Sequence, residues 1–274
     1  MKEFFFISGL PRSGSTLLSA ILRQNPEFYA DIASPVQSLI LSTINVITES
    51  ESNYLIDEDR RKHILKSIFN AFYDAVEPNT VFDTNKNWTA KTSLLKDLYP
   101  QTKIICCVRD LPWILDSFER ISAKNSLYSE TLIDVEARQT VTTRCDALMD
   151  VKKEGLVVKP YHFLEEGLML NPDMIMLVEY EMLCKQPESV MRELYAFIGK
   201  PYFDHDFKNV EYENEVYDKA LNMKSLHTVR KEVTWQERPT ILPKSVWEKY
   251  GKGTDFWRKP APSFEVKQLY KVKG

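Results

Sequence analysis

The stretch "FISGLPRSGSTLL", residues 6–18, is the feature that most restricts the fold of this chain. Its apolar start is typical of a buried strand, and its end, from Ser15, is typical of a helix. Gly9 and Gly14 lie in between, and a glycine turn that leads into a helix directs free backbone amides toward a bound anion. The stretch therefore predicts an α/β fold with an anion-binding loop after the first strand.

This loop lacks one residue that a loop for ATP or GTP requires. Nucleotide hydrolases place a lysine before the Ser or Thr that ligates magnesium, but Ser15 stands at that position here. The positive charge lies earlier, at Arg12, whose planar guanidinium can form two hydrogen bonds with a phosphate or sulfate. We expect Ser13, Gly14, Ser15 and Thr16 to supply amides and hydroxyls beside it. The alternative is a structural turn with a solvated arginine.

Short β-rich runs alternate with long helical runs over most of the chain. This alternation predicts a central parallel sheet with helices on both faces. From about Lys200 the sequence becomes polar, aromatic and rich in proline, which predicts an irregular C-terminal wrap. The expected strands are Glu3–Ser8, Thr80–Asp83, Lys103–Val108 and Met174–Tyr180, and the expected helices are 15–24, 35–49, 58–76, 111–124, 130–154 and 187–198.

Charge and cysteine content restrict the partners and the location. The net charge of −3 provides no positive field for nucleic acid, so any anion must be held by a local site. The short apolar N-terminal run is too brief for a membrane span and lacks the cleavage region of a signal peptide. The four cysteines lack CxxC spacing, which fits reduced thiols better than disulfides or zinc ligands. We therefore expect a cytoplasmic protein.

A second cluster of residues follows the strand expected at Lys103–Val108. The sequence "KIICCVRDLPWILDSFER" places Arg109 at the strand's carboxyl end, where open α/β sheets bind ligands, and begins a helix at Asp110. Ser117 lies about 10 Å further along that helix at about 1.5 Å per residue. Arg109 and Ser117 together thus predict a second anion site. The alternative is that Arg109 and Asp110 cap the helix and Ser117 is an ordinary surface residue.

Together the two clusters resemble the family of sulfotransferases that use 3′-phosphoadenosine 5′-phosphosulfate (PAPS). In that family a loop of the form PKSGTTW, or PRSGTTL in tyrosylprotein sulfotransferases, binds the 5′-phosphosulfate, and an Arg and a Ser eight residues apart bind the 3′-phosphate. "PRSGSTLL" is similar to the tyrosylprotein form, and Arg109 and Ser117 have that spacing. A third segment, "VEYEMLCKQPESVMRELYAFIGKP" at 178–201, is similar to the family's YEDL…P…L…FLG pattern.

This resemblance implies a P-loop-NTPase-like α/β fold, with one sulfotransferase domain over 1–274 whose segment from about 200 to 274 completes the donor and acceptor sites. It implies transfer of a sulfuryl group from PAPS, without a metal, to a hydroxyl or amine of a small molecule or peptide. Arg12 and its loop would hold the 5′ end of PAPS, and Arg109 with Ser117 would hold the 3′-phosphate. Lys86, in "DTNKNWT", stands where family members carry a lysine that contacts the transferring group, and Arg230 is a further candidate for the 3′-phosphate.

The family's general base does not carry over to this chain. Cytosolic members place a histidine beside the lysine, where this chain has Asn87 and Trp88, and tyrosylprotein members use a glutamate where this chain has Ile32–Ser34. Asp31 and Asp83, each expected at a strand end, are the nearest acidic candidates for the base. Either can equally be a helix cap or a loop carboxylate. His227 lies in the late stretch "SLHTVRKEV" and has no assigned role.

Two other functions fit parts of the sequence. A kinase for nucleotides or small molecules would use the same first loop, but it needs a lysine near Ser15 and an acidic magnesium ligand at a strand end, where Arg109 stands. A non-catalytic protein on a sulfotransferase scaffold also fits, because no base is identified. The late aromatic residues, which include Trp235 and Trp247, either stack on adenine or pack onto the core.

Overall fold

Five parallel strands form the centre of the computed structural model of this chain, in the order β2-β3-β1-β4-β5. The structure describes residues 2–49, 51–125, 133–210, 212, 218–219 and 226–258. The expected parallel sheet is therefore confirmed. The strands are β1 (Glu3–Gly9), β2 (Phe28–Ala30), β3 (Thr80–Thr84), β4 (Ile104–Val108) and β5 (Ile175–Glu179).

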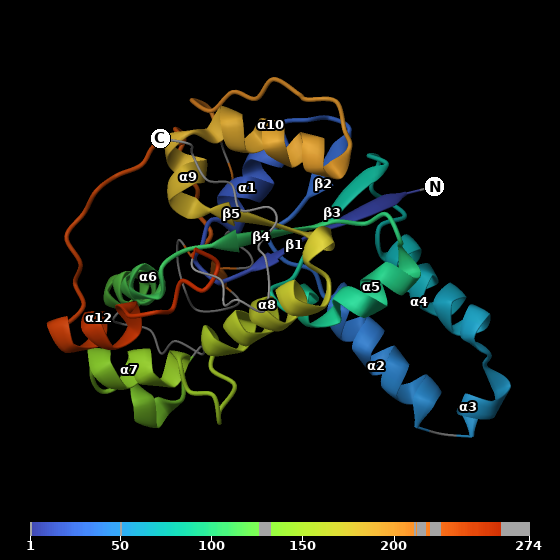
Figure 1. Cartoon of the computed structure of the whole chain (residues 1–274), viewed down its shortest axis with the longest axis horizontal. Helices are drawn as coiled ribbons and strands as arrows, with labels where there is room; N and C mark the ends of the chain where they lie inside the picture. The colour runs from blue at the N-terminus through green and yellow to red at the C-terminus, as the bar shows by residue number, and fades with distance from the viewer. Residues whose placement is uncertain are drawn as a thin grey trace.

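Helices cover both faces of this sheet (Figure 1). One face carries α1 (Ser15–Leu22), α9 (Tyr180–Lys185) and α10 (Pro187–Ile198). The other face carries α2 (Val36–Thr48), α4 (Glu58–Phe72), α5 (Thr92–Leu98) and α8 (Val158–Leu170). The remaining described helices are α3 (Ser52–Leu55), α6 (Leu111–Lys124), α7 (Val141–Leu148), α12 (Lys244–Gly251) and the short 3₁₀ helices η1 (Trp88–Lys91), η2 (Val135–Arg138) and η3 (Pro172–Met174).

The central strand β1 shows why both faces need a cover. Successive side chains of a strand point to opposite faces, so Phe4 and Phe6 pack into one hydrophobic core while Phe5 and Ile7 pack into another. The ring of Phe6 lies 4.9 Å from that of Trp88, centroid to centroid. Because both faces are buried, the strand is a continuous apolar run rather than an alternating one.

The sequence predicted one helix over 130–154, and this prediction is wrong over residues 133–154, which the structure describes. Residues 130–132 lie outside the described part of the chain. Residues Val135–Arg138 form η2, and a new helix, α7, begins after Thr140. The Thr140 and Thr143 side chains each bond the other residue's backbone amide, and this capping box starts a helix where the pattern had predicted its middle. Helix α7 then ends at Leu148.

The other expected elements differ less from the structure. Helices α1, α2, α6 and α10 match their expected ranges to within a few residues, and α4 ends at Phe72 rather than at 76. The short strand β2 was not among the four expected runs, although placing Asp31 at a strand end implied one there. Helices α5, α8, α9 and α12 were not expected.

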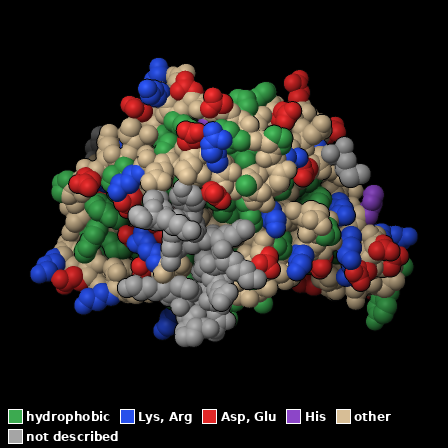
Figure 2. All heavy atoms as spheres, turned by 45° about the horizontal axis from the view of Figure 1, so that its top comes forward, with side chains coloured by type: hydrophobic (Ala, Val, Ile, Leu, Met, Phe, Trp, Pro, Cys, Tyr) green, Lys and Arg blue, Asp and Glu red, His purple; other side chains and the backbone are tan. Residues whose placement is uncertain are grey.

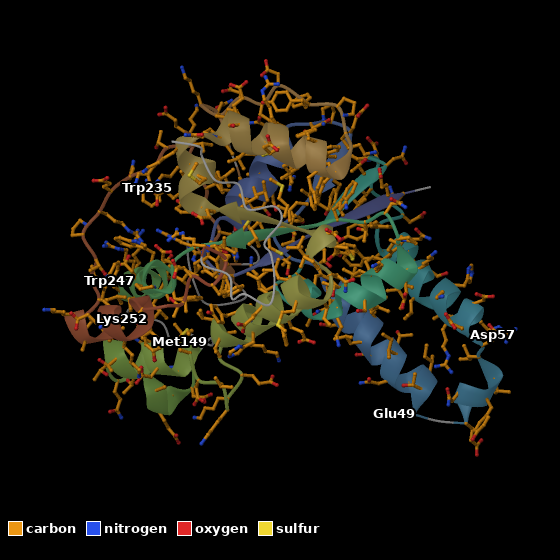
Figure 3. All side chains as sticks on the ribbon, in the orientation of Figure 1. Glu49, Asp57, Met149, Trp235, Trp247 and Lys252 are labelled. Atoms are coloured by element: carbon orange, nitrogen blue, oxygen red, sulfur yellow. The ribbon has the colours of Figure 1, made fainter. Side chains whose placement is uncertain are left out.

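Helices α2 and α4, joined through α3, project from the sheet as an arm, and Glu49 and Asp57 in Figure 3 mark its far end. Basic and acidic side chains lie interspersed on the face that Figure 2 shows, as the small net charge leads one to expect. In the part of the chain that the structure describes, no helix has both the length and the apolar character to cross a membrane.

Hydrogen bonds and ion pairs hold the late segment, residues 226–258, across the carboxyl ends of the strands. Asp116 of α6, which is fully buried, accepts hydrogen bonds from Arg238 at 2.7 Å and from the backbone amide of Ile241 at 2.9 Å. Arg258 forms ion pairs with Asp110 at 2.7 Å and Glu179 at 3.0 Å, just beyond β4 and at the last residue of β5. The expected wrap is thus observed over these residues, with α12 as its regular element.

Candidate anion-binding cleft

A cleft of about 690 Å³ opens at the carboxyl ends of the strands, where ligands of open α/β sheets collect. Its walls come from the loop after β1, the turns after β3 and β4, the start of α9, and the late segment. Of the residues predicted from the sequence, those that line it are Arg12, Gly14, Ser15, Thr16, Lys86, Arg109, Ser117 and Arg230.

Two glycines shape the loop after β1 because no side chain fits at either position. Gly9 has φ 97°, and a Cβ there would lie 2.3 Å from the carbonyl oxygen of Cys107. Gly14 has φ 100°, and a Cβ there would lie 2.8 Å from the ring of Tyr180. Arg12 between them also has a positive φ, 56°, a conformation that residues with a side chain seldom adopt and that recurs at functional sites.

Ser13 supports this loop rather than the cleft. Its side chain is fully buried, and its hydroxyl contacts the carbonyl oxygens of Leu10 and, at 2.7 Å, Cys107. The Ser13 hydroxyl is therefore used within the loop and does not face an anion, whereas binding by the Ser13 backbone amide stays a prediction. Helix α1 begins two residues later, at Ser15, and its first amides have no partner within the helix. Both Ser15 and Thr16 line the cleft.

Arg12 joins the two expected anion sites. Its Nε donates to the hydroxyl oxygen of Ser117 at 3.2 Å, and its Nη1 donates to the carbonyl oxygen of Leu226. Arg109 lies beside it, with its Nη1 3.5 Å from the carbonyl oxygen of Arg12. The sequence had suggested two separate anion sites, but the structure brings both clusters into one continuous cleft.

Lys86 completes a group of three cations in this cleft. It follows β3, and its backbone carbonyl accepts a hydrogen bond from Ser8 of β1 at 2.9 Å. Its Nζ donates to the hydroxyl of Ser15 at 2.5 Å, so the lysine points at the start of α1. A cation at the first turn of α1 faces the same place as the helix amides, where a bound anion would meet both.

None of these three cations forms an ion pair with a carboxylate among the described residues. Burial and the neighbouring charge of Arg109 lower the pKa of Arg12 to about 10. Burial and the charge of Arg12 lower the pKa of Lys86 to about 8. Burial also lowers the pKa of Arg109, whose buried Nε has no hydrogen-bond partner in the described part of the chain. Unpaired, mutually repelling cations of this kind favour an anionic ligand.

Aromatic rings hold Arg109 in place. Its guanidinium lies 4.5 Å from the ring centroid of Tyr180 and 5.9 Å from that of Trp113. Arg238 lies over the same Trp113 ring at 5.8 Å and lines the cleft, a role that the sequence did not reveal. Arg230, the late cation that was expected here, also lines the cleft and is exposed.

The late tryptophans separate into two roles. Trp235 lies beside α9 and lines the cleft, with its ring 6.0 Å from that of Tyr180 (Figure 3). Trp247 lies on α12, where its ring packs 4.9 Å from that of Trp113 (Figure 3). Tyr180 was within the reach of sequence reasoning, because it belongs to the segment at 178–201, whereas Trp235 carries no local signal.

The two carboxylates expected as bases do not line the cleft. Asp83 is fully buried and accepts hydrogen bonds from Ser34 at 2.5 Å, Tyr73 at 2.7 Å and the Trp88 indole at 2.6 Å. Asp31 accepts bonds from the Tyr212 hydroxyl and the Ile32 amide, each at 2.7 Å, besides a longer one from a nearby tyrosine. Asp83 links β3 to its neighbours and cannot reach an acceptor, so the expectation that it is the base is wrong.

Comparison with known families identifies residues 5–205 of the chain as a match to the model of the sulfotransferase family. The protein-tyrosine sulfotransferase of Drosophila melanogaster is 26% identical over 218 residues, which are 77% of this chain and 40% of the relative. Protein-tyrosine sulfotransferase A of Caenorhabditis elegans is 24% identical over 248 residues, or 82% of this chain and 60% of the relative. The chain thus spans about half the length of these curated relatives.

Solved structures give the same fold. The sulfotransferase domain from the curacin biosynthetic pathway is similar with a TM-score of 0.50 at 16% identity, over 97% of this chain and 94% of that domain. A mouse sulfotransferase complexed with PAP is similar with a TM-score of 0.52 at 15% identity, over 94% of this chain and 88% of that protein. At such identities the likeness concerns the fold alone, and it confirms the expected P-loop-like α/β architecture.

Proposed function

Because this chain belongs to the sulfotransferase family, we propose that it transfers a sulfuryl group from PAPS to a hydroxyl or amine acceptor. The observation that supports this most is the group Arg12, Lys86 and Arg109, which face one cleft without a carboxylate partner among the described residues. A donor with phosphate groups at both ends of an adenosine supplies the missing negative charges.

The residues of the cleft fit this donor. The Lys86 ammonium, the Arg12 guanidinium and the first amides of α1 would hold its 5′ end, while Arg109 and Ser117 would hold its 3′-phosphate. The unpartnered Nε of Arg109 supplies a buried donor for that phosphate. When bound, PAPS supplies a sulfuryl group on a phosphate leaving group, and the cations stabilise the charge that develops there.

Donor binding without a metal separates this function from a kinase. We expect calorimetric titration to show binding of 3′,5′-diphosphoadenosine (PAP) with the same affinity with and without Mg²⁺, because three side-chain cations perform the task of the metal. ATP with Mg²⁺ is the matched comparison. Binding of Mg²⁺-ATP together with failure to bind PAP would refute the proposed function.

We propose that the acceptor enters where the cleft is lined by Leu156, Lys159 and Pro160, at the start of α8. The curated relatives are named for transfer to protein tyrosine, so phenols and tyrosine peptides are the first acceptors to test. Transfer of ³⁵S from labelled PAPS to a phenol, a tyrosine peptide, an aliphatic alcohol and an amine would rank these classes. A protein that binds PAP and labels none of them would support the scaffold alternative.

The lowered pKa of Lys86 leads to a prediction about proton uptake. At pH 8 this lysine is close to half protonated, and a bound phosphate raises its pKa, so PAP binding should take up on the order of half a proton. Calorimetry at pH 8 in two buffers of different ionisation enthalpy measures the uptake. Lys86→Met should abolish it, whereas the exposed Lys96→Met should not; equal uptake by the Lys86 variant and the parent contradicts the assignment.

A cytoplasmic location also remains our proposal. The four cysteines are free and buried, which supports a reducing compartment. Cell fractionation tests this directly, and recovery of the protein in the secretory pathway contradicts it.

A further inference from the structure

We propose that His227 is the general base of the transfer reaction and that Asp218 is its positioning residue. This inference rests on the proposed function and names a base for it, since neither base position of the family is occupied here and Asp83 is sealed in the core. The His227 imidazole lines the cleft and is bonded to a buried carboxylate, and the other acidic groups there suit the role of base less well.

His227 lies directly beside the donor loop. The preceding residue, Leu226, accepts a hydrogen bond from Arg12 through its carbonyl oxygen, which fixes this part of the late segment over the loop. His227 itself lines the cleft together with Lys86. The charges of Arg12 and Lys86 both act on its imidazole. The ring thus lies in the same cleft as the two cations that we assign to the transferring group, and within range of their charges.

Asp218 holds this ring at two points. One carboxylate oxygen lies 2.6 Å from His227 Nδ1, and the other accepts the His227 backbone amide at 3.0 Å. The Asp218 side chain is only 6% exposed, so water does not compete for it. A carboxylate at Nδ1 keeps the proton of the neutral ring on Nδ1, and the basic lone pair is then on Nε2.

The charges around His227 keep it able to accept a proton. Burial lowers its pKa below the ordinary value near 6.5, the Asp218 carboxylate acts in the opposite direction, and the cations Arg12 and Lys86 lower it further. At pH 7 the imidazole is therefore mostly neutral. A base needs this state before reaction, and the carboxylate then stabilises the imidazolium that forms.

The other acidic groups that line the cleft suit the role less well. The Glu154 carboxylate is 69% exposed and forms an ion pair with Lys159. Glu232 is exposed at the surface. The Cys184 thiol has a pKa raised by burial, so it is a poor base at neutral pH. Among the cleft residues that the structure describes, His227 combines burial, orientation and a neutral state.

The proposed step moves one proton and one sulfuryl group. The acceptor O–H gives its proton to His227 Nε2 while the acceptor oxygen forms a bond to sulfur. The bond between sulfur and the 5′-phosphate oxygen breaks, and its electron pair stays on that oxygen, which leaves as part of PAP beside Arg12 and Lys86. The imidazolium then releases the proton to solvent.

The first test compares acceptors that do and do not need a base. His227→Ala should lower kcat/KM about 10²-fold for an unactivated phenol or alcohol, but less than about threefold for 4-nitrophenol at a pH where it is already ionised. Added imidazole should restore part of the lost rate. His162→Ala, at an exposed histidine of α8, is the matched control and should behave as the parent.

The second test reads the pH profile of the same reaction. In the parent, kcat/KM should fall on the acid side with an apparent pKa below the ordinary imidazole value, because burial lowers the pKa of His227. Asp218→Asn removes the group that raises the imidazole pKa, so this acid limb should move to lower pH while the plateau rate falls. A merely structural role for Asp218 would lower the rate without moving the limb.

PAP affinity distinguishes failure of this inference from failure of the proposed function. If His227→Ala binds PAP within about threefold of the parent and loses equal rate with ionised and unionised acceptors, or loses none, the base assignment is wrong and the function stands. If the parent itself neither binds PAP nor transfers sulfate, the proposed function is wrong and the base assignment falls with it.

Discussion

Arg12→Ala is expected to lower kcat by about 10²–10³-fold, the cost of removing one well-placed donor from a developing negative charge. The guanidinium is buried, in contact with Ser117, and held by a backbone in the left-handed region, so it is oriented before the donor arrives. Its main effect is on the charge of the leaving phosphate, which is greatest in the transition state. PAP affinity should therefore fall by less, by roughly tenfold.

Single-turnover rates with labelled PAPS and calorimetry with PAP separate these two effects. Arg60→Ala, at an exposed arginine of the projecting arm, is the control and should match the parent in both. If the variant keeps its kcat but loses PAP affinity, the role of Arg12 is to bind the donor, and its assignment to catalysis is wrong.

Arg109→Ala should mainly weaken donor binding, by about 1.5–3 kcal/mol or roughly 10- to 150-fold in Kd. Arg109 is oriented by the rings of Tyr180 and Trp113, and its buried Nε has no partner in the described part of the chain, so the whole cationic group is ready for a phosphate. Arg109→Glu places a negative charge against that phosphate and should cost at least about another tenfold.

The ligand pair PAP and adenosine 5′-phosphate shows whether the loss concerns the 3′-phosphate. In the parent, PAP should bind more tightly than adenosine 5′-phosphate, and Arg109→Ala should remove most of this preference. The exposed Arg192→Ala on α10 serves as the control. Equal affinity of the Arg109 variant and the parent for PAP would defeat the assignment.

The sequence predicted the parts of the site that depend on neighbouring residues. The loop from Gly9 to Gly14 follows a buried strand and precedes a helix, so its local pattern is complete within residues 6–18. Arg109 was also predictable, because the carboxyl end of a buried strand is a fixed place in a parallel sheet. The strand β2, only three residues long, is too short for such a pattern.

Residues that depend on distant contacts were missed or misread. Asp83 has the position of a catalytic carboxylate, but Tyr73 and Trp88, from other elements, donate hydrogen bonds to its two carboxylate oxygens. His227 and Arg238 lie in an irregular segment with no periodic pattern, and they reach the cleft only because Leu226 bonds Arg12 and Asp116 holds Arg238. Leu226 lies far from Arg12 in the sequence, and Arg238 lies far from Asp116. No short window of sequence therefore contains both partners of either contact.

The late segment across the cleft also affects when the protein becomes competent during synthesis. All five strands and the cations Arg12, Lys86 and Arg109 have been synthesised by residue 205, before Leu226, His227 and Arg238 are translated. A nascent chain at that stage has a nearly complete sheet but an open groove. The cleft therefore gains the wall that carries Leu226, His227 and Arg238 only after all the residues of the sheet have been synthesised.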